Sequence, residues 1–312
     1  MLAQLEALHP DDLRVIFRHF PLLSIHDKAS LAGQASEAAG AQGKFWPMYD
    51  ILFERWDEWV DLSPDAFRGW LSIAAIELDL DIDKFNDDLA VGRYSALMEE
   101  AFTAALSSGL TGTPAIFLND ELFPLAPELP VLEAFVRLEI HENRQFTAYP
   151  PMKLSAGSDL IVRLHLNIGE IVIQLYPDSA PLAVNSFLFL QNEGWFDGNG
   201  FIRVIEDVLA ETGDPSGTGF GDPGYHYQLE IDPRLDFGEV GMVAITNSGS
   251  DSNGSKFFIT LRPLPELDGQ HTIFGRVIDG LELLSSLEKR DPLDDILEPP
   301  QAFIKTVSVE SR

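Results

Sequence analysis

The side chains that carry most enzyme chemistry are scarce in this sequence of 312 residues. Cysteine is absent, which excludes thiolate nucleophiles, disulfides, cysteine-ligated zinc and iron–sulfur clusters. The seven histidines show no spacing typical of a metal site. The sequence therefore excludes thiol chemistry and predicts neither a metal nor a cofactor. It leaves the redox compartment open, since a cysteine-free protein tolerates either condition.

Two short motifs imitate known sites without completing them. Residues 79–83, Asp-Leu-Asp-Ile-Asp, match the opening of a calcium loop, but the sixth position is Lys84 instead of glycine and the twelfth is Ala90 instead of glutamate. We interpret them as a solvated turn between helices. Asn253-Gly254-Ser255 fits the N-glycosylation pattern, and a tight turn is enough to explain it.

The charge of the chain excludes other function classes. It has 50 Asp and Glu against 21 Lys and Arg, a formal charge of −29 that is shared almost evenly between its two halves. Such a surface repels phosphate backbones and anionic lipid, so we expect no nucleic-acid partner. No apolar run approaches 18 residues, and residues 1–20 lack the order of a signal peptide, so we expect no membrane insertion.

Four ordered motifs in the C-terminal half carry a resemblance to a known family. They are Phe201-Ile202-Arg203-Val204-Ile205 with Gly213-Asp214 following, Gly241 to Asn247, Asn253 to Ile259, and Leu267 to Gly275. In this order and spacing they resemble the cyclophilin family of peptidyl-prolyl isomerases. The resemblance implies an eight-stranded antiparallel β-barrel capped by two helices. It also implies cis-trans isomerisation of X–Pro bonds in unfolded or flexible chains, with proline-containing polypeptides as clients.

The chemistry of this reaction explains the residue types. Amide resonance opposes rotation about an X–Pro bond with a barrier of roughly 18–20 kcal/mol, and catalysis requires only tighter binding of the twisted amide. A guanidinium aimed at the prolyl nitrogen stabilises the lone pair that appears as resonance is lost. The resemblance makes Arg203 that guanidinium. It places Phe258, Leu209, Leu267 and His271 on the walls of the proline pocket, and gives the Asn247 backbone a role in holding the peptide.

Three residues depart from the family pattern. Val208 replaces the usual phenylalanine and leaves one pocket wall smaller, and Glu266 replaces the tryptophan or histidine before the Leu-Asp-Gly turn. Glu211 replaces the neutral glutamine beside the arginine and is expected to pair with Arg203, either orienting it or competing with substrate. We expect a working isomerase of modest activity. The alternative is a non-catalytic peptide-binding scaffold.

The N-terminal half is similar to the DsbA-like branch of thioredoxin-fold proteins, through residues 15–22, 42–53 and 112–119. The resemblance implies a cis peptide bond at Thr113-Pro114, with Pro114 as the family's cis-proline, and a location outside the cytoplasm with any export signal upstream of Met1. The first strand of that fold and its Cys-x-x-Cys are missing, which excludes a disulfide oxidoreductase. Two explanations stay open: the start is internal to a longer product, or the domain has become a docking surface.

Elements of two kinds must position these residues. Before residue 145 the pattern predicts a β-like run at 13–20, helices at 27–53 with a break at Gly40, 64–78, 83–91, 93–106 and 127–143, and a buried strand at 115–119. Phe45, Trp46 and Tyr49 are assigned to the core. Beyond residue 159 the apolar period becomes two, with a hairpin over 161–176 and a helix at 177–191.

The composition shift gives the domain organisation. We predict a DsbA-like, redox-inactive thioredoxin-fold domain at 1–147, a Pro/Ser/Gly linker at 148–158, and a mainly antiparallel β-barrel domain of the cyclophilin type at 159–312.

Overall fold

The computed structural model describes residues 1–154 and 157–311, and its contacts divide the chain into two compact units. Unit 1 comprises Met1–Arg14 and Leu125–Arg312, and unit 2 comprises Val15–Pro124. The limits that the sequence suggests, near residues 147 and 159, stay a prediction. Residues 155–156 of the predicted linker lie outside the described residues.

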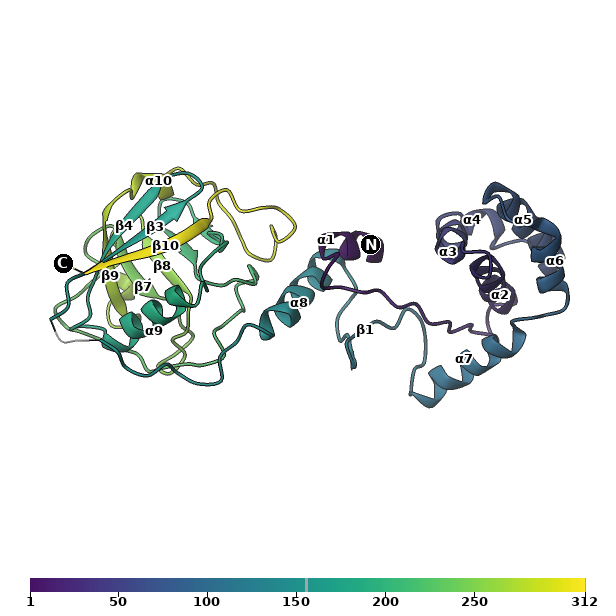
Figure 1. Cartoon of the computed structure of the whole chain (residues 1–312), viewed down its shortest axis with the longest axis horizontal. Coiled ribbons are helices and arrows are strands. Elements are labelled where there is room, and N and C mark those ends of the chain that lie inside the picture. The colour runs from purple at the N-terminus through teal and green to yellow at the C-terminus, as the bar shows by residue number, and fades with distance from the viewer. Residues whose placement is uncertain (155–156, 312) are drawn as a thin grey trace. The chain divides into compact units, whose positions relative to one another are not determined.

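Unit 1 is built on a curled sheet of eight antiparallel strands in the order β10-β3-β4-β9-β7-β8-β6-β5 (Figure 1). The strands are β3 (Leu160–Leu166), β4 (Glu170–Leu175), β5 (Arg203–Ile205), β6 (Leu209–Thr212), β7 (Met242–Ile245), β8 (Phe257–Thr260), β9 (Ile273–Asp279) and β10 (Ile304–Ser311). The predicted hairpin is β3–β4. An isolated bridge between Gly200 and Phe303 joins the chain beside β5 to the chain beside β10, which brings the two edges of the sheet together as in a barrel.

Successive side chains along a strand point to opposite faces of this sheet, so they belong to two separate apolar cores, one inside the sheet and one on its outer face. Val243, Phe257 and Ile259 belong to the main core inside the sheet. Their neighbours Ala244 and Phe258 face outward and join a smaller apolar cluster. Because both faces are covered, β7 and β8 are buried along their whole length.

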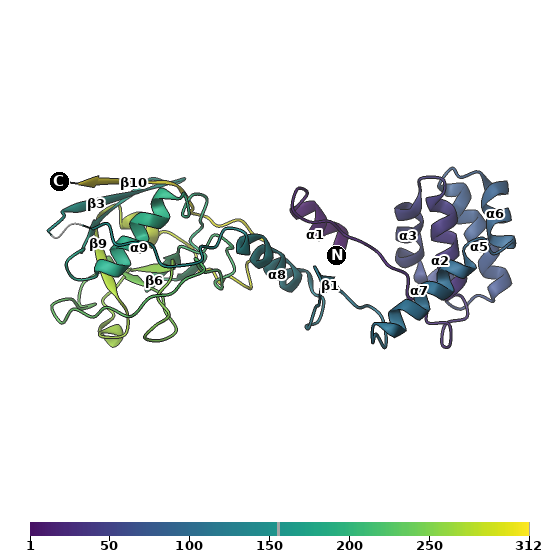
Figure 2. The ribbon, with the colours of Figure 1, turned by 60° about the horizontal axis from the view of Figure 1, so that its bottom comes forward.

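Two helices cap the sheet, α9 (Pro181–Asn192) and the short α10 (Glu282–Ser285). Figure 2 shows α9 lying along the sheet, and its buried residues include Phe187 and Leu190 of the main core. The sequence predicted this helix from residue 177, and the structure begins it at Pro181. The start is fixed there because the Glu230 carboxylate accepts the backbone N–H groups of Leu182 and Ala183, both at 2.9 Å.

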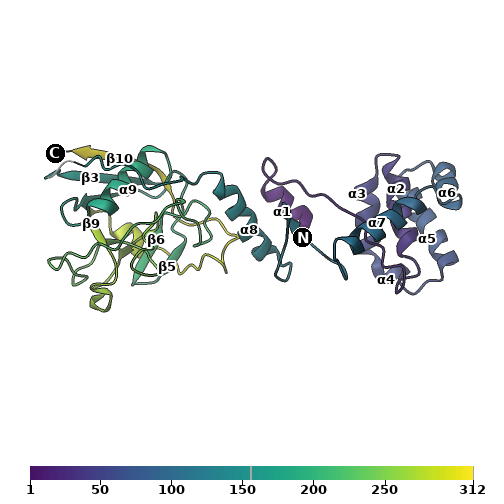
Figure 3. The same cartoon turned by 90° about the horizontal axis from the view of Figure 1, so that it is seen from below.

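Two further helices complete unit 1, α1 (Leu2–Leu8) and α8 (Leu129–Glu142), which contact each other. Glu133 of α8 is fully buried, and its carboxylate accepts from His9 Nε2 at 2.8 Å and Arg137 Nε at 2.6 Å. Figure 3 shows α8 in the ribbon. Near its C-terminal end, His141 Nε2 donates to the Asp222 carbonyl at 2.9 Å. Polar contacts therefore hold both ends of α8.

Unit 2 is mainly helical, and α2, α3, α5 and α6 lie side by side in it (Figure 2). The helices are α2 (Ala29–Gly40), α3 (Phe45–Glu54), α4 (Trp56–Trp59), α5 (Pro64–Glu77), α6 (Ile82–Ala90) and α7 (Ser95–Ser107). The predicted break at Gly40 separates α2 from α3. Ser63 caps α5 by accepting from the Ala66 N–H at 3.2 Å, with Pro64 in the first turn.

The strands predicted in this half are largely wrong. Residues 13–20 form no regular element, and they belong to neither sheet of the described residues. The buried strand predicted at 115–119 is reduced to β1 (Phe117–Leu118), which pairs only with β2 (Glu121–Leu122). Phe117 is 48% exposed, and in the described part of the chain this hairpin is a two-stranded sheet of its own.

Three other sequence interpretations for unit 2 have mixed outcomes. The Thr113-Pro114 bond is cis, as expected. The calcium-like motif is an inter-helix turn, as expected, in which Asp81 caps α6 by accepting from the Lys84 N–H at 3.0 Å. The assignment of Trp46 to the core is wrong: it is 45% exposed, because α3 turns it outward.

Candidate isomerase site

The hairpin of β5 and β6 places Arg203 beside Glu211. The two residues are direct cross-strand partners, so their side chains leave the same face of the sheet. Val204 and Ala210 point the opposite way into the main core and hold the hairpin in this register. Arg203 is half-buried at the outer face, and no carboxylate of the described residues lies within 4.0 Å of its guanidinium. The ion pair expected with Glu211 is therefore not formed in this structure.

Outward-facing side chains on the neighbouring strands continue from this pair, and we call the resulting line of residues, Arg203, Glu211, Phe258 and Ala244, the outer-face row. Glu211 of β6 faces Phe258 of β8, and Phe258 faces Ala244 of β7. The outer face thus presents, side by side, a guanidinium, a carboxyl group, an aromatic ring and a small methyl group. The sheet register places Arg203 and Phe258 on the same face with Glu211 between them, although 55 positions separate them in the chain.

An apolar cluster surrounds Phe258 and gathers most of the predicted pocket residues. Its buried members are Phe237, Met242, Ala244, Phe258, Leu264 and Ile273, and Tyr176, Val208, Leu209, Leu235 and Leu267 pack against it. Leu267 comes from the short 3-10 helix η1 (Pro265–Leu267). Val208, Leu209 and Leu267 are each half-buried, so part of every side chain faces outward. This is the surface that an apolar ring such as proline would contact.

Of the six buried members of this cluster, sequence reasoning named only Phe258 as a site residue and missed the other five, Phe237 and Met242 among them. Phe237 is fully buried, and its ring stacks on that of Phe258 with centroids 5.9 Å apart. It lies in an irregular segment, where the sequence has no periodic pattern that would predict a buried ring. Met242 lies in a motif that the sequence did single out, and the period of two along β7 puts it on the same face as Ala244.

His271 contacts the same ring from another side. Its imidazole meets Phe258 edge to face with centroids 5.1 Å apart, and its Nδ1 donates to the Ile245 carbonyl at 3.1 Å. Burial lowers the pKa of the His271 imidazole, which favours the neutral form. With Nδ1 donating, Nε2 is left as an acceptor.

Asn247 follows β7 and is half-buried. Its side-chain Nδ2 donates to the Gln270 carbonyl at 3.2 Å and to Asn253 Oδ1 at 3.3 Å, which fixes the residue between two loops. Within residues 1–154 and 157–311, none forms a main-chain hydrogen bond with the Asn247 amide or carbonyl. These groups are the ones predicted to hold a peptide backbone.

Glu211 is the most deeply buried charge-bearing residue of the row, with only 7% of its surface exposed. Burial raises the pKa of its carboxyl group, and the nearby Lys256 and Arg203 lower that pKa by a smaller amount. The Thr246 hydroxyl also lowers the pKa, although its geometry falls short of a well-formed hydrogen bond.

The Gly213-Asp214 motif fixes the loop after β6. Gly213 has φ +96°, and a side chain there would collide with the Ser255 carbonyl oxygen. The buried Asp214 carboxylate accepts from the backbone N–H groups of Ser216, Gly219 and Gly221 at 2.8, 2.7 and 3.0 Å. The motif therefore organises the support of the site.

Asn253 has a similar structural role. It is fully buried, and its Nδ2 donates to the Gln228 carbonyl at 3.1 Å and to Thr272 Oγ1 at 2.9 Å. A buried amide with these partners explains the residue without glycosylation.

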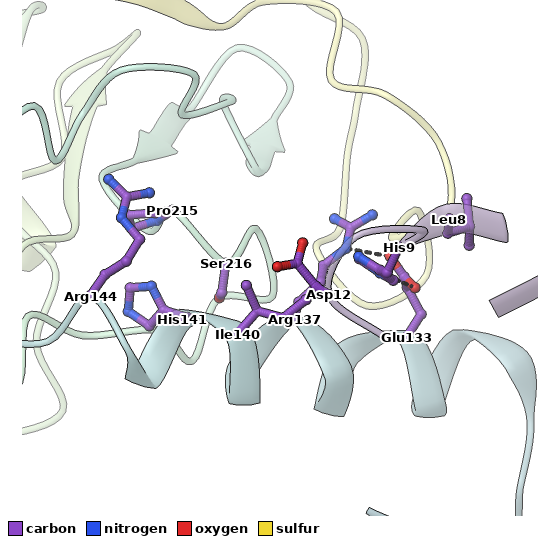
Figure 4. Close-up of a pocket in the computed structure, with 10 residues that line it drawn as sticks. All are labelled: Leu8, His9, Asp12, Glu133, Arg137, Ile140, His141, Arg144, Pro215 and Ser216. Atoms are coloured by element: carbon purple, nitrogen blue, oxygen red, sulfur yellow. Dashed lines mark hydrogen bonds and ion pairs between the residues drawn. The ribbon is translucent and has the colours of Figure 1, made fainter. Parts of the chain in front are cut away.

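Two other features do not belong to this row. Pro114 is exposed and belongs to unit 2. A hollow of about 310 Å³ borders α8 in unit 1 (Figure 4), and it is lined by Leu8, His9, Asp12, Glu133, Arg137, Ile140, His141, Arg144, Pro215 and Ser216. None of the predicted site residues lines this hollow. In the described part of the chain, no three His, Asp or Glu side chains are placed to hold a metal, and no helix is both long and apolar enough to cross a bilayer.

Comparison with known proteins assigns both halves of the chain. Residues 161–310 match the model of the cyclophilin type peptidyl-prolyl cis-trans isomerases, and residues 3–136 match a thioredoxin model. The peptidyl-prolyl cis-trans isomerase ppi1 of Schizosaccharomyces pombe is 41% identical over 153 residues, which are 47% of this chain and 98% of the relative. The mouse peptidyl-prolyl cis-trans isomerase-like 1 is 39% identical over 144 residues, 43% of this chain and 87% of the relative.

A solved structure is also similar, the cyclophilin type isomerase of Cryptosporidium parvum. It is 30% identical, with a TM-score of 0.45, and the match covers 50% of this chain and 99% of that one.

The fold and the sequence relatives together define the class of the protein. The chain belongs to the cyclophilin family of peptidyl-prolyl cis-trans isomerases. Its C-terminal half is the isomerase domain, and this domain is fused to an N-terminal thioredoxin-like domain.

Proposed function

We propose that the isomerase works at the outer-face row of the sheet, with Arg203 as the catalytic guanidinium. The observation that carries this proposal is the register of β5, β6 and β8, which aligns Arg203, Glu211 and Phe258 on one face. The absence of an ion pair at Arg203 among the described residues supports it, since the guanidinium keeps its donors for a ligand.

The proposed mechanism needs no covalent step. The proline ring packs on Phe258 between Leu209, Leu267 and His271, and the Asn247 amide and carbonyl hold the peptide backbone. As the amide twists, the prolyl nitrogen becomes pyramidal and regains a lone pair. Arg203 donates to that lone pair only when resonance is lost, so it stabilises the transition state more than the ground state.

The same site is built for modest activity. Val208 is smaller than the phenylalanine usual at its position, so it covers less of a bound ring. Glu211 places a carboxyl group where a neutral amide is usual, directly beside Arg203. Both departures leave the isomerase chemistry in place and reduce the binding that supports it.

We further propose that clients are flexible, proline-containing polypeptides, that the protein acts outside the cytoplasm, and that the thioredoxin-like half holds clients. Exposed aromatic side chains on α3 and α4 support the last point: Trp46 is 45% exposed, Phe53 62% and Trp56 55%. Acidic residues interleave with these rings, which suits a basic client segment. The same exposed rings favour the alternative, a peptide-binding scaffold without catalysis.

A refolding assay separates the two functions. A denatured protein whose slow refolding phase is X–Pro isomerisation is diluted into buffer with the full chain at a small fraction of its concentration. An isomerase accelerates the slow phase at this substoichiometric amount. A chain that leaves the slow phase unchanged and affects refolding only at equal concentration acts as a scaffold, and that result overturns the proposal.

A further inference from the structure

The strongest unassigned feature of the site is the buried carboxyl group of Glu211. It lies in the middle of the row, with Arg203 on one side and Phe258 on the other. Arg203 and Glu211 are direct partners in an antiparallel pair, so their Cβ atoms are about 4.5–5.5 Å apart. Rotation of the two side chains is enough to bring a guanidinium and a carboxylate into contact, without any movement of the backbone.

The groups that face Glu211 come from four segments. Arg203 faces it from β5, Lys256 from the residue before β8, Asp214 from the loop after β6, and the Thr246 hydroxyl from the end of β7. The Lys256 ammonium is already engaged, because it donates to the Gly219 carbonyl. Asp214 is also engaged, by the N–H groups of its own loop. Lys256 has the larger influence on the pKa of Glu211, but its contact with the Gly219 carbonyl anchors its ammonium. Arg203 makes no ion pair with the described residues, so it is the cation that can reorient toward Glu211.

We propose that Glu211 is a positioning residue whose ionisation reduces isomerase activity by drawing Arg203 away from the substrate. As a carboxylate it matches the fork of the guanidinium and occupies the donors that the prolyl nitrogen needs. As a neutral acid it releases them. This inference rests on the proposed catalytic role of Arg203 and adds a pH dependence to it.

The switch operates at a higher pH than the ordinary titration of a glutamate. Burial is the largest influence on Glu211 and raises the pKa of its carboxyl group above the ordinary 4.5, against the smaller effects of Lys256 and Arg203. The carboxyl group therefore takes up a proton at a higher pH than an exposed glutamate. Activity should rise as the pH falls through this range.

His271 is a further titratable group at the site, and its effect must be separated from that of Glu211. Burial lowers the pKa of its imidazole, and it contacts Phe258 instead of Arg203. Replacing Glu211 leaves His271, Lys256 and Asp214 unchanged. A difference between the pH profiles of the wild type and a Glu211 variant therefore reports on Glu211 itself.

The first test is the pH profile of kcat/KM between pH 8 and pH 5, measured by NMR exchange on a proline-containing peptide. Glu211→Gln keeps the shape of the side chain and removes its titration. Glu206→Gln, an exposed position on the same hairpin, is the matched control for lost charge. We expect wild type and Glu206→Gln to gain activity several-fold on acidification, and Glu211→Gln to be nearly flat and at least as active at pH 8. Parallel profiles, or a Glu211-dependent loss of activity toward low pH, overturn the proposal.

The second test does not depend on catalysis. The side-chain Nε signal of Arg203 is followed by NMR in arginine-labelled protein over the same pH range and is assigned with Arg203→Lys. We expect this signal to shift with pH in the wild type and in Glu206→Gln, and to stay still in Glu211→Gln. An Arg203 signal that ignores the state of Glu211 contradicts the inference even if the protein is an active isomerase. Inactivity of the wild type at every pH instead rejects the proposed function, and the Arg203 signal still decides the coupling.

Discussion

Arg203 and Phe258 illustrate what single residues contribute to this site. A half-buried arginine is by itself no evidence of catalysis, and a buried phenylalanine is ordinary core. The strand register is what indicates a site, since it places both residues on one face of the sheet with Glu211 between them. The apolar cluster around Phe258, with Val208 packed against it, is the surface at which we propose that a proline ring binds.

Enlarging that wall is expected to strengthen peptide binding. Val208→Phe adds about 40 Å² of apolar contact with a bound ring, worth about 1 kcal/mol or a KM about fivefold lower, with little change in kcat. Steady-state kinetics on a proline-containing peptide measures the effect. Ile278→Phe, at an exposed position on β9, controls for a general gain in hydrophobicity. An unchanged KM in Val208→Phe would show that Val208 is not in the peptide site.

The sequence motifs identified four of the residues that form the apolar cluster around Phe258. Phe258, Leu209, Leu267 and Val208 indeed meet in one cluster. Phe237 escaped prediction because it joins the cluster from an irregular segment, where only tertiary contacts bury it. The contact weighed between Arg203 and Glu211 is not formed in this structure, since register fixes the strands but leaves the side-chain rotamers free.

At the scale of elements, α9 shows how a remote side chain sets a helix boundary. Proline and acidic residues near 177 predict an early start, yet the helix begins at Pro181, where Glu230 accepts two of its first N–H groups. The strand predicted at 13–20 failed for the complementary reason. A β-like pattern becomes a strand only where a neighbouring strand pairs with it, and the sequence of one segment does not show which segments lie beside it.

The α9 boundary yields a stability prediction. Glu230→Gln leaves one amide oxygen for two N–H donors and removes the negative charge from the helix N-terminus. We expect unit 1 to lose about 1 kcal/mol, which lowers its Tm by about 2–4 °C. Thermal unfolding followed by circular dichroism measures this loss at pH 7. The exposed Glu288→Gln should melt like the wild type, and an unchanged Tm in Glu230→Gln would show that this cap contributes nothing.

At the scale of the whole molecule, the main features are the fusion of two folds and a formal charge of −29. This sequence has no cysteine, so the thioredoxin-like half has no thiol for thiol–disulfide exchange. The excess charge surrounds any approaching client with a negative potential.

This potential predicts a preference for basic clients. A peptide with lysines beside its X–Pro bond should have a higher kcat/KM than one with glutamates, several-fold at low ionic strength. The ratio should shrink toward one at about 1 M salt, where the Debye length is about 3 Å. Exchange rates for the two peptides across a salt series provide the measurement. A ratio that is independent of salt would mean that the net charge does not guide client choice.

The central claim is that Arg203 catalyses prolyl isomerisation at the outer face of the sheet. The direct measurement is NMR exchange between the cis and trans forms of a proline-containing peptide, with wild type, Arg203→Ala and Lys305→Ala. Lys305 is an exposed cation on β10, the strand at the opposite end of the sheet order from β5. Removing one positioned donor from a transition state should lower kcat/KM about 10²–10³-fold in Arg203→Ala, and Lys305→Ala should keep the wild-type rate. A wild type no faster than the uncatalysed exchange, or an Arg203→Ala variant as fast as the wild type, would contradict the account.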